Sequence, residues 1–220
     1  NTQIQNILNL LCKIDIEIKI VPGIFEIIEG DANWQSIRPI KPEDLLGREE
    51  VGLDIDKVSN FYSDKTVFVT GGGGSIGREV IKNVLKLPVK KVIAFGRGEN
   101  SIHNLIEEYH NNSKFDFVIG NIQDKNKLRH EISKHQPNII FHTAAHKHLP
   151  LMEKYPDEAV KNNIIGTYNL ASIAKENNIE NFIMISTDKA VYPSNCMGAT
   201  KRLCELMAQN MAACSTGFSI

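Results

Sequence analysis

The residues of this chain with the clearest chemical purpose are the glycines in G-G-G-G-S-I-G, residues 71–77. They follow a β-rich run, Thr66–Thr70, and lead into a helical pattern, so they form a strand-to-helix turn. In such a turn the first glycine allows a tight bend, the second lets the backbone approach a pyrophosphate, and the third permits close helix–strand packing. The N-terminus of the helix adds free N–H groups for a phosphate. The predicted cofactor contacts in this loop are Gly71, Gly74, Ser75, Ile76 and Gly77.

The end of the next predicted strand indicates which dinucleotide would bind. An acidic residue there would hydrogen-bond the ribose 2′-hydroxyl of NAD. The sequence has Gly96 at that position, followed by Arg97. Arg97 could pair with the 2′-phosphate of NADP, so NADP is the expected cofactor. NAD is the alternative if Arg97 is solvated and Glu99 turns inward.

Strands and helices must alternate to position these residues, and after Lys65 they do. We expect strands at Thr66–Thr70, Lys91–Phe95, Phe115–Ile119, Asn138–His142 and Asn181–Ser186. We expect helices from the glycine loop to Leu87 and at Ser101–His110, Lys125–Lys134, Asp157–Asn177 and Met197–Ala213. This alternation indicates βαβ units with right-handed crossovers. The predicted fold class is α/β, a doubly wound parallel sheet of the Rossmann type.

Residues 1–60 follow a different pattern. Ile4, Ile7, Leu8 and Leu11 have helical spacing, and the isoleucines from Ile14 to Ile20 alternate with polar residues, as in a strand. Pro39 and Pro42 indicate a loop. We therefore expect a partial α/β domain and linker over residues 1–60, and a cofactor-binding core over residues 61–220. The absence of an initiator methionine suggests a fragment.

Composition excludes several classes of protein. The 220 residues are 42% hydrophobic and 23% charged, with a net charge of −1, so no basic excess indicates nucleic acid as a partner. No apolar run approaches the roughly 20 residues of a membrane span, and no signal peptide is visible. The four cysteines have neither CxxC nor zinc spacing, which favours reduced thiols in an intracellular protein. His146 and His148 lack a carboxylate or cysteine at ligand spacing, so no metal is expected.

Beyond residue 140 the sequence resembles a known family. Residues 142–153, H-T-A-A-H-K-H-L-P-L-M-E, resemble the H-A-A-A-x-K-H-V-P-L-M-E motif of bacterial polysaccharide-biosynthesis dehydratases. Further matches are N-I-I-G-T at 163–167, S-T-D-K-A-V at 186–191, M-G-A-T-K-R at 197–202 and D-L-L-G-R at 44–48. These proteins resemble UDP-N-acetylglucosamine 4,6-dehydratases, which are extended short-chain dehydrogenase/reductases. The resemblance runs over nearly the whole chain.

That resemblance carries expectations about the whole protein. It implies a UDP-sugar substrate, a homo-oligomer and a role in surface polysaccharide or glycan synthesis. Larger members have N-terminal transmembrane helices, so a cytoplasmic place at the inner face of the membrane is expected. Most of the family's sugar-nucleotide lobe would lie beyond residue 220.

The resemblance also implies a mechanism. Hydride passes from sugar C4 to the nicotinamide, water is lost across C5 and C6, and hydride returns to C6. This cycle needs a base at C5 and an acid at the C6 hydroxyl. Asp188 as acid and Lys189 as base fit these roles, or the reverse, and Thr187 would hydrogen-bond the 4-oxygen. Met197 stands where short-chain dehydrogenases have the tyrosine of Tyr-x-x-x-Lys, and its thioether cannot remove a proton. Lys201, four residues on, would hold the nicotinamide ribose.

The remaining assignments follow from the same motifs. Asn121 replaces the aspartate of the family's G-D-I-R-D and can still accept a hydrogen bond from the adenine amine. Further cofactor contacts are expected from Ile122, Ala144, Ala145 and Asn163. Lys147 and His148 are expected to bind the substrate. Two other functions stay open: a nucleotide-sugar 4-epimerase, which normally uses the missing tyrosine, and a cofactor-binding module without catalysis.

Overall fold

The computed structural model describes residues 19–20, 38–39 and 55–213. The chain divides into two compact units, Asn1–Asp54 and Ile55–Ile220. In the first unit, β1 (Lys19–Ile20) pairs antiparallel with β2 (Arg38–Pro39). Pro39 was expected in a loop, but it lies in a two-residue strand, and a strand at the edge of a sheet tolerates proline. The helix expected near Ile4 and the D-L-L-G-R segment lie outside the described residues.

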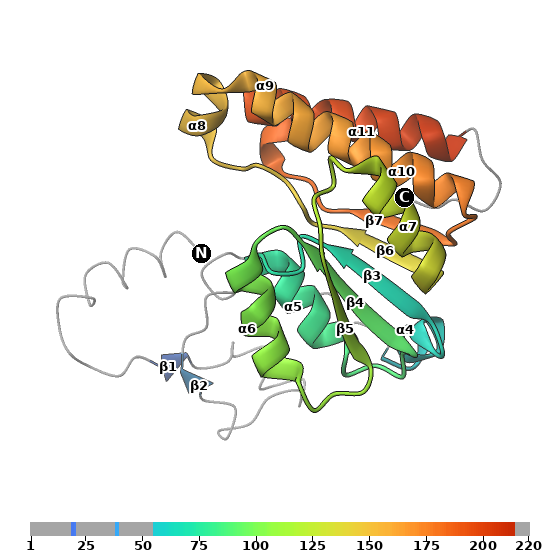
Figure 1. Ribbon diagram of the computed structural model, residues 1–220. Helices are drawn as coiled ribbons and strands as arrows, with labels where there is room; N and C mark the ends of the chain where they lie inside the picture. The colour runs from blue at the N-terminus through green and yellow to red at the C-terminus, as the bar shows by residue number, and fades with distance from the viewer. Residues whose placement is uncertain (1–18, 21–37, 40–54, 214–220) are drawn as a thin grey trace. The chain divides into compact units, whose positions relative to one another are not determined.

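The second unit is built on a parallel sheet of β3 (Thr66–Thr70), β4 (Lys91–Gly96), β5 (Phe115–Ile119), β6 (Ile139–His142) and β7 (Asn181–Met184). The spatial order is β5-β4-β3-β6-β7 (Figure 1). The chain first builds outward from β3 through β4 to β5, and then crosses back to place β6 on the other side of β3. The predicted doubly wound α/β fold is confirmed. The order reverses between β3 and β6, and ligands of such sheets bind beyond the carboxyl ends of the strands at this point.

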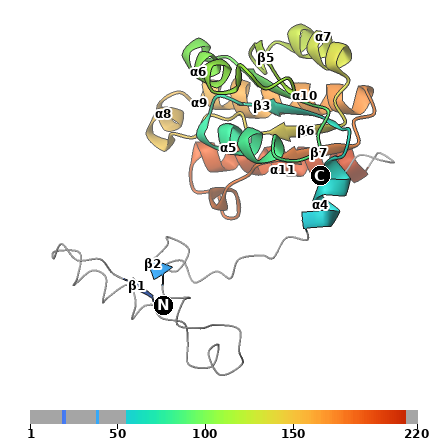
Figure 2. The same cartoon turned by 90° about the horizontal axis from the view of Figure 1, so that it is seen from below.

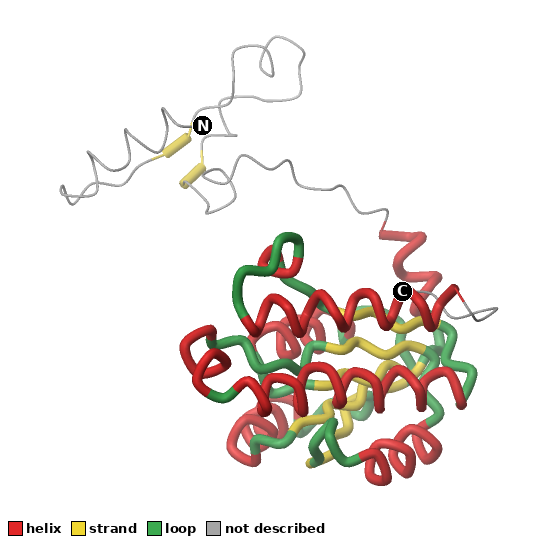
Figure 3. Tube along the Cα trace, turned by 90° about the horizontal axis from the view of Figure 1, so that it is seen from above, coloured by secondary structure: helices red, strands yellow, loops and turns green. Residues whose placement is uncertain are grey.

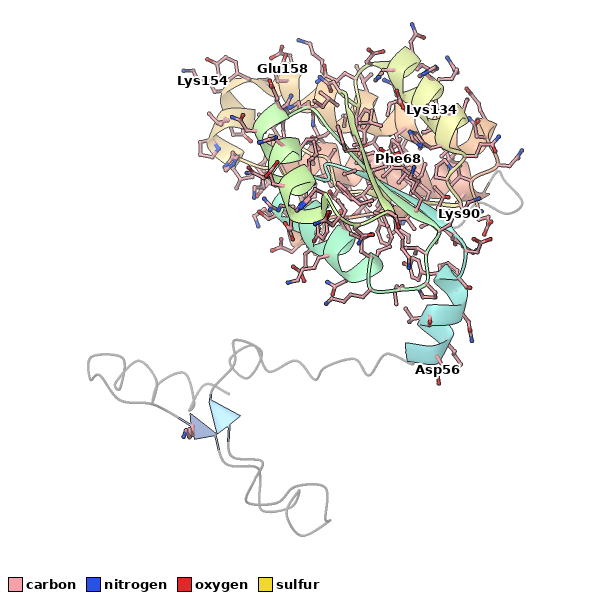
Figure 4. The ribbon with its side chains drawn as sticks, turned by 60° about the horizontal axis from the view of Figure 1, so that its bottom comes forward. Asp56, Phe68, Lys90, Lys134, Lys154 and Glu158 are labelled. Atoms are coloured by element: carbon pink, nitrogen blue, oxygen red, sulfur yellow. The ribbon has the colours of Figure 1, made fainter. Side chains whose placement is uncertain are left out.

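Helices cover both faces of this sheet (Figure 1 and Figure 2). On one face, α5 (Ser75–Val84) and α6 (Glu99–Tyr109) pack Ile81 and Leu105 against Val67 and Val69. On the other, α7 (Lys125–His135) and α10 (Gly166–Glu176) pack against Phe68, which is labelled in Figure 4. Alternate residues of β3 therefore serve opposite cores, as the pleat of a strand requires. Figure 3 shows the strands enclosed between helices.

Two helices lie outside the predicted pattern. α4 (Ile55–Tyr62) precedes β3 and spans residue 60, where the sequence pattern changes. α8 (Leu149–Lys154) follows β6, and it accommodates Pro150 because a helix tolerates proline in its first turn. α11 (Cys196–Ala213) closes the described part of the unit. None of the described helices is both long and apolar enough to cross a membrane.

The helix expected over Asp157–Asn177 is interrupted. The chain forms α9 (Pro156–Ala159), then a π-helical turn, η2 (Val160–Ile165), and then α10. The sequence pattern did not predict the π-helical turn, which widens the helix locally and turns the side chains of Asn162 and Asn163 inward, where both are buried. Such turns frequently occur at functional sites.

Candidate active site

A cavity of about 300 Å³ lies beyond the carboxyl ends of β3, β4, β5 and β6. Seven of the residues predicted to contact the cofactor line it, and these are Gly71, Gly74, Arg97, Asn121, Ile122, Ala144 and Ala145. The predicted residues that do not line it are Ser75, Ile76, Gly77, Asn163 and Lys201. Residues that were not predicted to contact the cofactor complete the wall, among them Gly73, Ser101, Thr143, His146 and Asn162.

The three glycines with the expected spacing have three different surroundings. Gly71 has a positive φ of 69°, and a Cβ there would lie 2.7 Å from the backbone nitrogen of Ala144. Gly77 is buried, and its Cβ would lie 2.8 Å from Gly72 Cα. A Cβ on Gly74 would meet only the carbonyl oxygen of Gly71, at 3.2 Å. Gly71 and Gly77 therefore shape the turn, whereas Gly74 keeps the cavity wall free of a side chain.

The N-terminus of α5 is open beside this wall. No side chain caps the helix at Gly74, and the amide of Gly74 itself donates to the carbonyl of Gly71 at 2.8 Å. Ser75 and Ile76 are exposed in the first turn, where helical N–H groups have no partner within the helix. A pyrophosphate at the glycine loop would accept from these groups, and it would benefit from the positive end of the helix dipole.

Arg97 and His146 come from two different loops and contact one another at the cavity wall. Arg97 Nη2 lies 3.5 Å from both His146 Nδ1 and Nε2, so the guanidinium is shared between the two ring nitrogens. Burial and the Arg97 charge lower the pKa of His146, against an opposing effect of Glu158. No aspartate or glutamate lines the cavity. Asn121, in the loop after β5, accepts from the Gln123 amide at 3.1 Å, a local bond that the sequence did not suggest.

Asn163 connects the cavity to α11. Its Oδ1 accepts from the backbone N–H of His146 at 2.8 Å, and its Nδ2 donates to the carbonyl of His146 at 3.1 Å. The same Nδ2 lies 3.1 Å from Thr200 Oγ1, next to Lys201. Asn163 thus fixes the backbone of the loop after β6 instead of lining the cavity that the sequence motif suggested it would contact.

His142, the first residue of the motif at 142–153, is a buried, neutral histidine. The sequence did not indicate that it would be buried. Its Nδ1 lies 2.7 Å from Thr70 Oγ1 and its Nε2 lies 2.8 Å from Thr167 Oγ1. Burial, assisted by the Lys201 charge, lowers the pKa of His142 to about 3. The ring therefore joins the strand before the glycine loop to α10 through two neutral hydrogen bonds.

Acidification should destabilise the protein through His142. In the unfolded chain this histidine titrates near 6.5, whereas in the folded chain it stays neutral down to about pH 3. The unfolded state therefore binds the extra proton first, and the contribution to stability is lost as pH falls below 6.5, by about 1.4 kcal/mol per pH unit. Urea denaturation measures the free energy of unfolding at pH 8 and pH 5. The decrease between the two pH values should be smaller in His142→Gln than in the original protein, by about 2 kcal/mol. Equal pH dependence in the variant and the original protein would contradict the assignment.

The predicted acid–base pair lies on η3 (Asp188–Ala190), after β7. Lys189 Nζ is 3.2 Å from Asp188 Oδ1, and the Thr187 hydroxyl donates to the same oxygen at 2.9 Å. The hydrogen bond from Thr187, followed by the bond and charge of Lys189, lowers the pKa of Asp188. The Asp188 side chain is 85% exposed, so both groups can reach a molecule bound outside the protein surface. To donate a proton, Asp188 must first take one up, and loss of solvent around it is the change that would raise its pKa.

The Met-x-x-x-Lys pair is buried on α11. Met197 packs with Met152 and Ala159 in a small apolar cluster, so its thioether is buried against protein. Lys201 is 5% exposed, and its Nζ donates to the carbonyl of Ile185 at 2.7 Å. Burial lowers the pKa of this ammonium. Lys201 therefore fixes the chain between β7 and η3.

Lys147 and His148 are exposed on the loop that leads into α8 and do not line the cavity. Among the described residues, no group of three or more histidine, cysteine or acidic side chains could hold a metal ion. The structure thus presents a cavity that suits a dinucleotide and, after β7, an exposed pair of ionisable side chains, Asp188 and Lys189.

Comparison with known proteins identifies relatives along most of the chain. The profile of a family described as "Polysaccharide biosynthesis protein" matches residues 67–219. The capsular polysaccharide biosynthesis protein CapD of Staphylococcus aureus is 43% identical over 211 residues, which are 94% of this chain and 35% of CapD. The probable polysaccharide biosynthesis protein EpsC of Bacillus subtilis is 45% identical over 204 residues, 91% of this chain and 34% of EpsC. This chain therefore spans about a third of the length of these relatives.

Other relatives are named as epimerases. A UDP-glucose 4-epimerase of Rickettsia rickettsii is 38% identical over 151 residues, 67% of this chain and 43% of the epimerase. Among solved structures, Pen from Bacillus thuringiensis has a TM-score of 0.68 at 31% identity and covers 72% of this chain and 50% of its own. A UDP-glucose 4-epimerase of Thermotoga maritima, solved with UDP-glucose, has a TM-score of 0.59 at 25% identity. The match covers 67% of this chain and 51% of the epimerase.

Proposed function

Because this chain belongs to the family of polysaccharide biosynthesis proteins, we propose that it is the cofactor-binding and catalytic core of a nicotinamide-dependent enzyme that modifies a nucleotide sugar. The observation that carries this proposal is the pairing of two features in one unit. A cavity with an open helix N-terminus and glycine walls suits a dinucleotide, and an exposed aspartate–lysine pair lies on the loop after β7.

The reaction that we propose is 4,6-dehydration of UDP-N-acetylglucosamine. Elimination of water from the sugar needs one protein group that accepts the C5 proton and one that protonates the departing hydroxyl. Asp188 and Lys189 are adjacent ionisable groups that can fill these roles. A bound nicotinamide would supply the hydride acceptor and return the hydride. Thr187, whose hydroxyl is already directed at Asp188, would turn to the sugar 4-oxygen.

A 4-epimerase is the second candidate, because close relatives carry that name. The described residues of α11 argue for the dehydratase instead. The position four residues before Lys201 is a buried methionine, which cannot remove a proton from a sugar hydroxyl. Tyr192 is 90% exposed and lies outside the helix that holds Lys201.

NADP is the dinucleotide that we propose, with NAD as the alternative. Arg97 lies at the cavity wall directly after β4, where the adenosine ribose is bound in this fold. No carboxylate lines the cavity to accept from a 2′-hydroxyl or to repel a 2′-phosphate. The homo-oligomer and the place at the inner face of the membrane stay predictions from the family resemblance.

Incubation of the full-length protein with UDP-N-acetylglucosamine tests the reaction. A dehydratase yields a nucleotide sugar that is lighter by one water, and mass spectrometry detects this directly. An epimerase yields a product of unchanged mass with inverted C4, which NMR distinguishes. Either an inverted product or unchanged substrate would reject the dehydratase proposal, and unchanged substrate with retained cofactor binding would favour a binding module.

A further inference from the structure

The contact between Arg97 and His146 brings together two side chains that can both carry positive charge. They come from different loops, one after β4 and one after β6, and the guanidinium lies 3.5 Å from both ring nitrogens. None of the ion pairs found among the described residues involves Arg97, and no acidic side chain lines the cavity between the two. Glu158 acts on His146 through its charge alone, and no carboxylate among the described residues is hydrogen-bonded to either side chain. A cavity wall that holds two such groups together with no acidic residue in the lining is complementary to an anion.

The backbone of His146 is held by hydrogen bonds. Both backbone polar groups of His146 bond to the side chain of Asn163, at 2.8 Å and 3.1 Å. Asn163 is itself buried and bonded to Thr200. The His146 ring therefore extends into the cavity from a fixed backbone, whereas Arg97 lies between two glycines that place no side chain in its way. The arrangement is an imidazole on a hydrogen-bonded backbone beside the guanidinium of an exposed arginine.

We propose that His146 is a second residue that selects the cofactor, and that it binds the 2′-phosphate of NADP together with Arg97. The inference rests on the proposed function, because it requires a dinucleotide in this cavity. The phosphate would insert between the guanidinium and the imidazole, replacing a contact between two potential cations with two charge-assisted hydrogen bonds. Ser101, whose hydroxyl donates to the Gly98 carbonyl at 2.8 Å, lies on the same wall and completes the polar surroundings.

The binding constants of NADPH and NADH, measured by fluorescence for His146→Ala and Arg97→Ala, test this inference. Each substitution should weaken the binding of NADPH about tenfold or more and leave the binding of NADH within about twofold, because only NADPH offers a charged 2′-phosphate as hydrogen-bond acceptor. Adenosine 2′,5′-bisphosphate should compete with NADPH in the original protein, and it should compete more weakly in both variants. His103→Ala, on the exposed side of α6, is the matched control and should change neither constant.

The double variant separates a shared ligand from two independent effects. If one phosphate bridges both side chains, the losses in NADPH affinity will not add, as expected for groups in one network. An equal loss of NADPH and NADH in His146→Ala would overturn the inference, because the residue would then act on the part that both cofactors share. Absence of dinucleotide binding in the original protein would instead reject the proposed function. Tight binding of NADH in preference to NADPH would reject the role of His146 while leaving the enzyme class intact.

Discussion

Replacing Gly74 with valine should strongly weaken dinucleotide binding and leave the fold intact. Gly74 lines the cavity, and its Cβ position has only the Gly71 carbonyl oxygen nearby, at 3.2 Å. The valine methyl groups would therefore occupy the space in which the pyrophosphate approaches the backbone, without entering the protein core. The expected loss is at least about 100-fold in affinity, or roughly 2.7 kcal/mol. Calorimetric titration with NADP measures the loss, and thermal unfolding tests that the fold is kept.

Two further variants make this result specific to the cavity. Gly77→Val should prevent folding, because a Cβ there would lie 2.8 Å from Gly72 Cα in the closely packed turn. Lys82→Val, on the exposed face of α5, controls for the effect of a β-branched residue in this helix and should bind NADP normally. If Gly74→Val binds with unchanged affinity, the dinucleotide does not lie against this loop.

The regular elements of the fold could be predicted from local patterns. The strands Thr66–Thr70 and Phe115–Ile119 have the predicted bounds, because short β-branched and aromatic runs between turn residues are a local signal. The helix Lys125–His135 extends one residue past the prediction and is terminated by Gln136, which has a positive φ of 44°. Helix ends depend on such single residues, and sequence patterns locate them poorly.

The features that the sequence could not predict depend on contacts between distant residues. The π-helical turn at Val160–Ile165 interrupts a segment whose periodicity indicates one continuous helix. Asn163 was expected at the cofactor, yet its amide reaches the backbone of His146, 17 residues earlier in the chain. His146 itself was considered only as a metal ligand, because its position opposite Arg97 depends on how two loops approach each other across the sheet.

Asp188→Asn and Lys189→Met should each lose dehydration while they keep the fold and the dinucleotide. Neither residue lines the cavity, and the ion pair between them is exposed, so its removal should change stability little. Asparagine keeps the shape of Asp188 and still accepts from Thr187, but it cannot donate a proton to the departing hydroxyl. Methionine keeps the stem of Lys189 but cannot act as a base. Each proton transfer contributes roughly 10²–10⁴ in rate, which sets the expected loss in the full-length enzyme.

Partial reactions should separate the two roles. In heavy water, exchange of the sugar C5 proton requires only the ketone and the base, so it should fail in Lys189→Met and persist in Asp188→Asn; the opposite pattern would exchange the assigned roles. Mass spectrometry of recovered substrate measures the deuterium. Lys90→Met is the matched control. Lys90 lies directly before β4, at the amino ends of the strands, whereas Asp188 and Lys189 follow the carboxyl end of β7. Figure 4 shows Lys90 far from Glu158, which lies in α9. Near-normal turnover in either variant would remove that residue from the mechanism and direct attention to Lys147 and His148, the exposed ionisable groups on the loop after β6.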